Sequence, residues 1–341
     1  MVKANAYGIG MAEVVRTLEP LDPWGYGVAA VEEGVALRGL GVRRPIFVAT
    51  PIPPGSEADA VMAGLTPSVS DVGSLTRLRA AAEAAGSSID FHVEVDTGMG
   101  RSGFDAASAA EWGRAVRDGA GPLRWTGALT HFHSADEAEG EKATRDQMRR
   151  FEVALDALPV RRTNLVVHAS NSAAALRYPD LALDLVRPGI FLYGGAIAPL
   201  GSGVPEPQAV AAIRARISLV REVPGGTTAG YGATHVTDNA ATWATAAIGY
   251  GDGLPRALGN RGFALVRGRR VPIIGRVSMD SVVLDVSAVP GVVAGDVATL
   301  VGHDGDDALL LDEVAGLAQT ISYEILTRLG ARLERIYRDE A

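Results

Sequence analysis

The chain has 341 residues, and 32 basic against 40 acidic residues give it a net charge of −8 at pH 7. The length suggests two domains, and the acidic balance argues against nucleic acid as the main partner, because phosphate binding needs a clustered basic surface. The sequence has no cysteine, which excludes disulfides and cysteine-ligated metals, and it shows neither a bilayer-spanning apolar run nor an export signal. We therefore predict a soluble, cytoplasmic, globular protein without a nucleic-acid or membrane partner.

Strand-like and helical segments alternate through the first two thirds of the chain. We expect strands at 24–30, 45–50, 65–70, 89–96, 125–132, 163–169 and 183–187, and helices at 31–40, 71–85, 106–118 and 141–158. With the short stub before Lys3, the strand number reaches eight, which predicts a (β/α)8 TIM-like barrel over residues 1–200. A doubly wound open sheet is the alternative, but no Gly-x-Gly-x-x-Gly turn follows an early strand, as that fold would require.

The pattern changes at about residue 195. We expect the Pro- and Gly-rich stretch 197–208 to be a linker. Short alternating runs at 211–220, 241–248, 264–266, 270–274, 281–286 and 297–301 then predict a mainly β C-terminal domain over residues 201–341. A helix at 311–317 and a final stretch at 321–329 complete this domain.

Chemically active side chains gather where the predicted barrel strands end, which is where such barrels place their sites. The positions there are Lys3, Tyr7, Glu32, Arg101, His131, His168, Asn171, Ser172 and the segment Arg187-Pro188-Gly189. A partly desolvated Lys3 near arginine or histidine cations would have a lowered pKa and could act as a nucleophile. The alternative is a solvated lysine near a frayed terminus.

Two of these segments suit a phosphate group, and one suits a carboxylate. Ser172 opens a helix after a buried strand, and Gly189 lets backbone N–H groups approach a ligand closely; the alternative for Ser172 is a plain N-cap. Arg101 ends a glycine-bearing loop and offers a forked donor for a carboxylate, although a tight turn with a surface arginine would look the same.

The second domain carries polar or sulfur-bearing tips on glycine-rich loops. Tyr231 lies between two glycines, which are poor neighbours for core packing, although a buried core tyrosine is the usual alternative. Tyr250 and the pair Met279 and Asp280 lie in loops of the same character.

Taken together, these segments resemble alanine racemase, a pyridoxal-phosphate enzyme family built from a barrel and a β domain. The similarity extends over nearly the whole chain, and so many motifs in the same order are highly specific. The motifs are Val-Lys-Ala-Asn-Ala-Tyr-Gly, Asp-Thr-Gly-Met-Gly-Arg, Thr-His-Phe, His-Ala-Ser-Asn-Ser, Val-Arg-Pro-Gly, Gly-Tyr-Gly-Ala-Thr, Ile-Gly-Tyr, Gly-Arg-Val-Ser-Met-Asp and Ile-Ser-Tyr-Glu.

The resemblance implies a role for each candidate residue. Lys3 would hold the cofactor as a Schiff base, Arg187 would face its pyridine nitrogen, and His131 would lie against its ring and support Tyr231. The phosphate would be held by Tyr7, Ser172, Gly189, Ile190 and Tyr323. The substrate carboxylate would be received by Arg101 and the backbone of Met279, while Tyr250 and Asp280 would shape the entrance. The family also implies a head-to-tail homodimer, in which the β domain of one subunit completes the site of the other.

Racemisation explains why these residue types are needed. The α-proton of an amino acid leaves on one face and a proton returns on the other, so an amine (Lys3) and a phenol (Tyr231) on opposite faces are a direct solution. The phenol would have to be made more acidic by cations such as Arg187 acting through His131. A charged Arg187 should also keep the pyridine nitrogen unprotonated and so limit transamination, whereas a decarboxylase relative would be expected to have an acidic residue there.

Three positions depart from the family pattern. Only two residues precede Lys3, so we expect that the sequence begins at an internal methionine or is a truncated form whose first barrel strand is cut short. Glu94 stands where relatives often have a carbamylated lysine that pairs with the arginine equivalent to Arg101, and its carboxylate would supply the same negative charge. Ile9 replaces a common histidine without an assigned consequence.

Two other functions compete with alanine racemisation. A broad-specificity or serine racemase on the same scaffold differs by one hydroxyl in its substrate, which the sequence does not resolve. A non-catalytic protein that binds pyridoxal phosphate would need Lys3 and the phosphate ligands, but it would have no use for Tyr231 or for a β domain.

Overall fold

The computed structural model describes residues 1–197 and 204–338, and the chain divides into two compact units. The first unit comprises Met1–Ala6, Gly10–Phe191 and Ile197–Glu206, and the second comprises Tyr7–Ile9, Leu192–Ala196 and Pro207–Ala341. Part of the predicted linker, residues 198–203, lies outside the described residues. The limits 1–200 and 201–341 stay a prediction.

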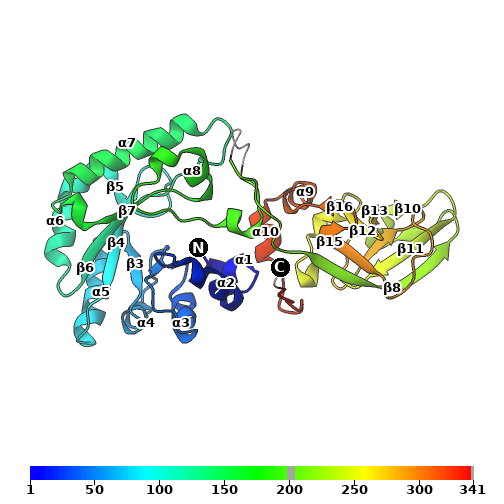
Figure 1. Ribbon diagram of the computed structural model, residues 1–341, viewed down its shortest axis with the longest axis horizontal. Coiled ribbons are helices and arrows are strands. Elements are labelled where there is room, and N and C mark those ends of the chain that lie inside the picture. The colour runs from blue at the N-terminus through cyan, green and yellow to red at the C-terminus, as the bar shows by residue number, and fades with distance from the viewer. Residues whose placement is uncertain (198–203, 339–341) are drawn as a thin grey trace. The chain divides into compact units, whose positions relative to one another are not determined.

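A curled parallel sheet forms the first unit (Figure 1). Its strands follow the order β1 (Tyr26–Val28), β2 (Ile46–Val48), β3 (Thr66–Val69), β4 (Asp90–Asp96), β6 (Arg124–Leu129) and β7 (Val166–His168), with the short β5 (Phe104–Asp105) beside β4. Every residue of β1, β2 and β3 is buried, as expected for a parallel sheet that helices cover. The TIM-like architecture predicted from the sequence is present as a half-barrel.

Helices connect or flank these strands, as the alternating pattern predicted. They are α2 (Met11–Leu18), α3 (Val31–Gly39), α4 (Glu57–Met62), α5 (Val72–Ala84), α6 (Ala109–Gly119), α7 (Glu141–Ala157) and α8 (Ser172–Arg177). Asp71 caps α5 by accepting the Ser74 N–H at 2.8 Å. Along α7, Met148, Phe151 and Leu155 are buried at helical spacing, so packing of this face fixes the helix against the rest of the unit.

Two of the eight predicted strands are not strands in the structure. Residues 1–2 belong to no strand, although the Val2 N–H donates to the carbonyl of Gly27, within β1, at 2.8 Å. Within 183–187, only Leu185 forms an isolated parallel bridge, with His168. The reason is local, because Leu183 has a left-handed backbone (φ 57°) and the Asp184 carboxylate takes the Val167 N–H at 2.9 Å.

The second unit is a closed antiparallel sheet, which confirms the predicted mainly β C-terminal domain. The strands follow the order β12 (Phe263–Val266), β13 (Arg269–Ile274), β14 (Val282–Asp285), β11 (Ala241–Ala246), β8 (Ile213–Val223), β15 (Val297–Asp304) and β16 (Asp307–Leu309), and β12 also pairs with β15. This extra pairing closes the ring and leaves few free edges. The unit also contains a short hairpin, formed by β9 (Thr228–Ala229) and β10 (His235–Val236), and two helices, α9 (Leu311–Leu317) and α10 (Ser322–Thr327).

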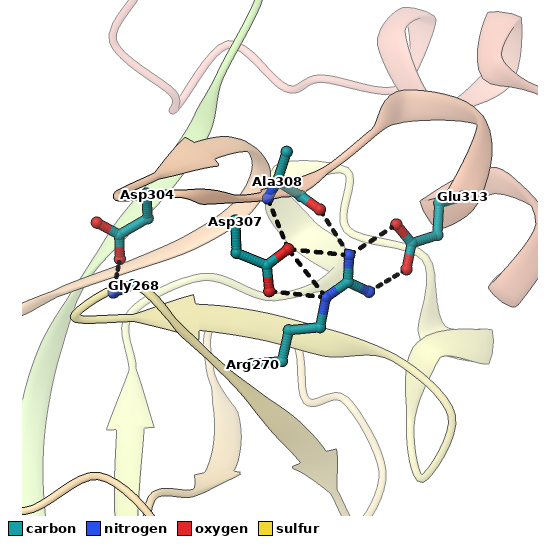
Figure 2. A network of polar contacts seen from close by, with 6 residues as sticks. All are labelled: Gly268, Arg270, Asp304, Asp307, Ala308 and Glu313. Carbon is teal, nitrogen blue, oxygen red and sulfur yellow. Dashed lines mark hydrogen bonds and ion pairs between the residues drawn. The ribbon is translucent and has the colours of Figure 1, made fainter.

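Two features show how the second unit packs: buried and exposed residues alternate along β8, and an ion-pair network joins three of its elements. Along β8, buried Ile213, Ala215 and Ile217 alternate with exposed arginines, which is the period of a strand with one face in the core. Figure 2 shows Arg270 of β13 bound to the carboxylates of Asp307 and Glu313. This arginine therefore ties β13 to both β16 and α9.

No helix among residues 1–197 and 204–338 combines the length and the hydrophobicity that a membrane crossing requires.

Candidate active site

Lys3 begins a segment with an uncommon backbone, α1 (Lys3–Tyr7). Ala4, Asn5 and Ala6 have φ of 53–55° and ψ of 48–55°, the left-handed helical region, which costs about 1–2 kcal/mol per residue for L-amino acids. The Ala4 N–H donates to Glu33 at 2.5 Å, and the Asn5 side chain accepts the Met11 N–H at 2.8 Å. These bonds hold the strained turn, so the half-buried Lys3 has a fixed direction.

The surroundings of Lys3 disfavour its charged form. Burial lowers the pKa of the Lys3 amine first, and the nearby positive charges of Arg101 and Arg187 lower it further, while the Glu33 carboxylate opposes them. The lowered pKa expected from the sequence is therefore present. It favours an amine that can bind a carbonyl carbon or accept a proton.

Arg187 is buried and is held by uncharged acceptors. Its guanidinium donates to the Nδ1 atoms of His168 (2.7 Å) and His131 (3.2 Å), and to the carbonyls of Thr130 (3.0 Å) and Ala169 (2.8 Å). In the described part of the chain, no carboxylate forms an ion pair with it. Burial lowers the pKa of Arg187 to about 10, so at neutral pH it presents a fixed positive charge.

His131 is neutral and is oriented by Arg187. Because a guanidinium only donates, Nδ1 of His131 must accept, and the ring proton is on Nε2. Burial, followed by the charge of Arg187, lowers the pKa of His131 to about 3. The link between Arg187 and His131 that the resemblance implied is present, and it leaves an imidazole N–H for a further partner.

Ser172 and Gly189 converge as the predicted phosphate site requires. The Gly189 N–H donates to the Ser172 hydroxyl at 2.7 Å, and Ile190 beside them is buried. The plain N-cap alternative is wrong for Ser172, because Asn171 caps α8 by accepting the Ala174 N–H at 3.0 Å. A hydroxyl and backbone amides are the donors that a phosphate prefers.

Glu94 is buried on β4 among hydroxyl groups. Its carboxylate accepts from Ser102 (2.8 Å), Ser70 (3.2 Å) and Ser68 (3.4 Å). Arg101 is exposed, and within residues 1–197 and 204–338 it forms no ion pair. Glu94 therefore supplies a buried negative charge, but it does not pair directly with Arg101 here.

The second unit groups the remaining predicted residues in two places. Tyr7 and Tyr323 have ring centroids 6.1 Å apart, and Tyr193 stacks on Tyr7 at 4.7 Å. Burial strongly raises the pKa of the Tyr7 phenol, so it is a protonated donor at neutral pH. The loops of Tyr250 and Met279 are joined by backbone bonds, from Tyr250 to Ser278 at 3.0 Å and from Gly251 to Met279 at 2.9 Å.

The candidate side chains on the loops of the second unit are exposed to different degrees. Tyr231 is 70% exposed, Met279 52% and Tyr250 39%. Tyr231 lies between Gly230 (φ 68°) and Gly232 (φ 75°), where a left-handed backbone and the approach of Arg276 would strain any other residue. Asp280 forms an ion pair with Arg332, which also binds Asp252. The carboxylate of Asp280 is therefore engaged in an ion pair.

Sequence reasoning missed Glu33 and His92. Glu33 anchors the turn after Lys3, and no local motif marks it. His92 was detectable, because polar residues stand at every second position of the buried β4, His92 and Glu94 among them, and such a row faces one side of a sheet. No cluster of acidic or histidine side chains suited to a metal ion occurs in the described residues.

Comparison with known proteins gives one family. Residues 1–197 match the family model "Alanine racemase, N-terminal domain", and residues 210–337 match "Alanine racemase, C-terminal domain". The alanine racemase of Sorangium cellulosum is 40% identical over 350 residues, which cover 99% of this chain and 91% of that protein.

Solved structures agree with this result. Alanine racemase from Bartonella henselae, with covalently bound pyridoxal phosphate, has a TM-score of 0.88 at 29% identity and covers 99% of this chain and 91% of its own. Alanine racemase from Bacillus anthracis, with bound L-Ala-P, has a TM-score of 0.89 at 31% identity and covers 97% and 86%.

Proposed function

The chain belongs to the alanine racemase family, and we propose that Lys3 and Tyr231 are the two groups with which it moves the α-proton of alanine. Its activity is that of a pyridoxal-phosphate-dependent isomerase that interconverts L-alanine and D-alanine. The observation that carries the assignment of Lys3 is the fixed, half-buried amine whose pKa is lowered beside Arg101 and Arg187.

The donor set of the first unit fits pyridoxal phosphate. Lys3 would hold the cofactor covalently, Ser172 and the amides of Gly189 and Ile190 would hold its phosphate, and Arg187 would face its pyridine nitrogen. When bound, the cofactor supplies the electron sink that stabilises negative charge on the substrate carbon. A charged arginine without a carboxylate partner among the described residues favours an unprotonated pyridine nitrogen. Tyr7 and Tyr323 stay predicted phosphate donors.

Proton transfer follows from the positions proposed for the two bases. Lys3 takes or returns the α-proton on one face, and Tyr231 does so on the other, so the direction of reaction decides which acts first. Arg101 and the Met279 backbone would hold the substrate carboxylate, and Tyr250 and Asp280 would shape the entrance. In this proposal the buried charge of Glu94 replaces the carbamylated lysine of relatives.

A head-to-tail homodimer is part of the proposal. Tyr231, Met279 and Tyr250 are exposed in a single chain, whereas a proton-transfer site has to exclude water. A second copy that covers these tips would create that environment. The cytoplasmic location stays a prediction from the sequence.

The proposed activity is tested by incubating the purified chain with pyridoxal phosphate and L-alanine and following optical rotation. Loss of rotation to zero is expected, and the same assay with L-serine measures how strict the specificity is. Cofactor binding without any loss of rotation would instead support the non-catalytic alternative.

A further inference from the structure

A second buried imidazole lies behind the Arg187 site and has no part in the function proposed above. His168, at the end of β7, accepts from Arg187, and the opposite nitrogen of its ring (Nε2) lies 2.9 Å from Nδ1 of His92 on β4. Both rings are 1% exposed. Arg187, His168 and His92 therefore form a continuous buried chain of hydrogen bonds.

The geometry fixes the direction of this chain. Arg187 can only donate, so Nδ1 of His168 carries no proton and its Nε2 does. That Nε2–H donates to His92, whose Nδ1 is consequently unprotonated. Burial lowers the pKa of His92 to about 4 and that of His168 well below its ordinary value, so both rings are neutral, as this pattern requires.

The sheet between the two histidines is shaped to allow their contact. β6 separates β4 from β7, and the residue of β6 that pairs with His92 is Gly127. A Cβ atom on Gly127 would lie 2.4 Å from the His92 ring, so only glycine lets the ring cross β6 toward His168. Phe47 packs on both rings, with centroids at 5.4 Å and 5.2 Å, and this apolar contact favours the neutral forms.

We propose that His92 is a positioning residue for the racemase reaction: it accepts the His168 proton, holds His168 in the tautomer that Arg187 needs, and so fixes the guanidinium toward the cofactor. The inference rests on the proposed role of Arg187. Without the His92 acceptor, His168 can turn or change tautomer, and a protonated Nδ1 would face the guanidinium donor to donor. The substrate itself would not lose a contact.

Two substitutions separate this role from simple packing. His92→Leu removes the acceptor but keeps an apolar side chain, whereas His92→Asn can place an amide oxygen close to the position of Nδ1. We expect kcat to fall about tenfold for His92→Leu, the effect of one lost hydrogen bond, with KM within about twofold. We expect His92→Asn to keep most of the wild-type kcat.

A histidine ¹⁵N NMR spectrum of the cofactor-free full chain provides a readout independent of activity. The sequence contains six histidines, and His168→Gln identifies the His168 signals. We expect a slowly exchanging Nε2 proton on His168 in the wild type and in His92→Asn, and its loss in His92→Leu. Should His92→Leu not fold, His92→Asn alone decides by keeping or losing that proton.

Two outcomes would overturn the inference. One is a His168 that carries its proton on Nδ1 in the wild type, and the other is an equal loss of kcat in both folded variants, which would indicate packing alone. Absence of racemisation in the wild type would refute the proposed function instead, while the NMR result would still report on the hydrogen bond.

Discussion

The two units present their reactive groups in opposite ways. The first unit buries Arg187 and Glu94 among hydrogen-bond partners and half-buries Lys3, so burial and neighbouring charges tune these groups. The second unit exposes Tyr231, Met279 and Tyr250 on loops whose backbone is fixed. The contrast teaches that the first unit tunes its groups by its own burial and charges, whereas the role proposed for the second unit's groups would require a covering surface, as the proposed homodimer would provide.

Removing Lys3 should produce the largest effect, because it eliminates the amine proposed both to hold the cofactor and to move the α-proton. For Lys3→Ala we expect racemisation to fall by about 10³–10⁴, typical for loss of a combined base and covalent anchor. The only other lysine of the chain is Lys142, whose side chain is 89% exposed and pairs with Asp146. Lys142→Ala is the matched control and should keep full activity.

Chemical trapping locates the cofactor in the same experiment. Borohydride reduction followed by peptide mapping should find the cofactor on the Lys3 peptide. A label on Lys142, or substantial activity in Lys3→Ala, would remove the basis for the first unit as the cofactor site.

Glu94 tests whether buried charge or mere shape matters in the first unit. Glu94→Gln keeps the hydrogen bonds to the serines but loses the negative charge, so we expect KM for alanine to rise about tenfold, in the range of one lost charged contact. Ser102→Ala keeps the charge and should change KM much less. Steady-state kinetics measure both, and an unchanged KM in Glu94→Gln would exclude the proposed replacement of the carbamylated lysine.

Glu33 should tune the Lys3 amine without touching the substrate. Its negative charge raises the pKa of Lys3, so Glu33→Gln should lower that pKa further. The rate of cofactor uptake by the cofactor-free chain, followed against pH, should then reach its half-maximum at lower pH. Arg101→Gln should shift this half-maximum to higher pH. The variant Glu32→Gln, at an exposed neighbouring position, is the control and should leave the half-maximum unchanged. A shift in the same direction for Glu33→Gln and Arg101→Gln would contradict the electrostatic account.

The last prediction concerns acid stability, which depends on two histidines of the first unit. The unfolded chain binds a proton on each histidine near pH 6.5, whereas folded His92 and His131 accept one only at about 4 and about 3. Stability should therefore fall as pH drops from about 6.5 to 4, by up to about 1.4 kcal/mol per pH unit for each such histidine. Urea unfolding midpoints, measured at several pH values for the wild type and for His92→Leu, should fall less steeply with decreasing pH in the variant. If the midpoints of the two proteins fell in parallel, His92 would be charged in the folded protein.

The local sequence pattern predicted most of the helices and strands. It missed features that depend on backbone conformation and on how distant strands pair. Alternating helices and strands predicted the first unit, and the helix at 311–317 has the bounds of α9. The expected strand 183–187 failed because Leu183 adopts a left-handed backbone that its sequence does not signal. At the candidate site, motifs drew attention to Lys3 and Ser172, but the contact between His92 and His168 depends on strand order and on Gly127 of the strand between them.

Mixing two inactive variants tests the proposed sharing of the site between subunits most directly. Lys3→Ala and Tyr231→Phe chains should each be inactive alone, yet a hybrid dimer would contain one site with both wild-type groups. Random reassociation makes half of the dimers hybrid, so we predict recovery of about one quarter of the wild-type activity. No recovery, in a mixture shown by mass spectrometry to contain hybrids, would contradict an amine and a phenol supplied by different chains.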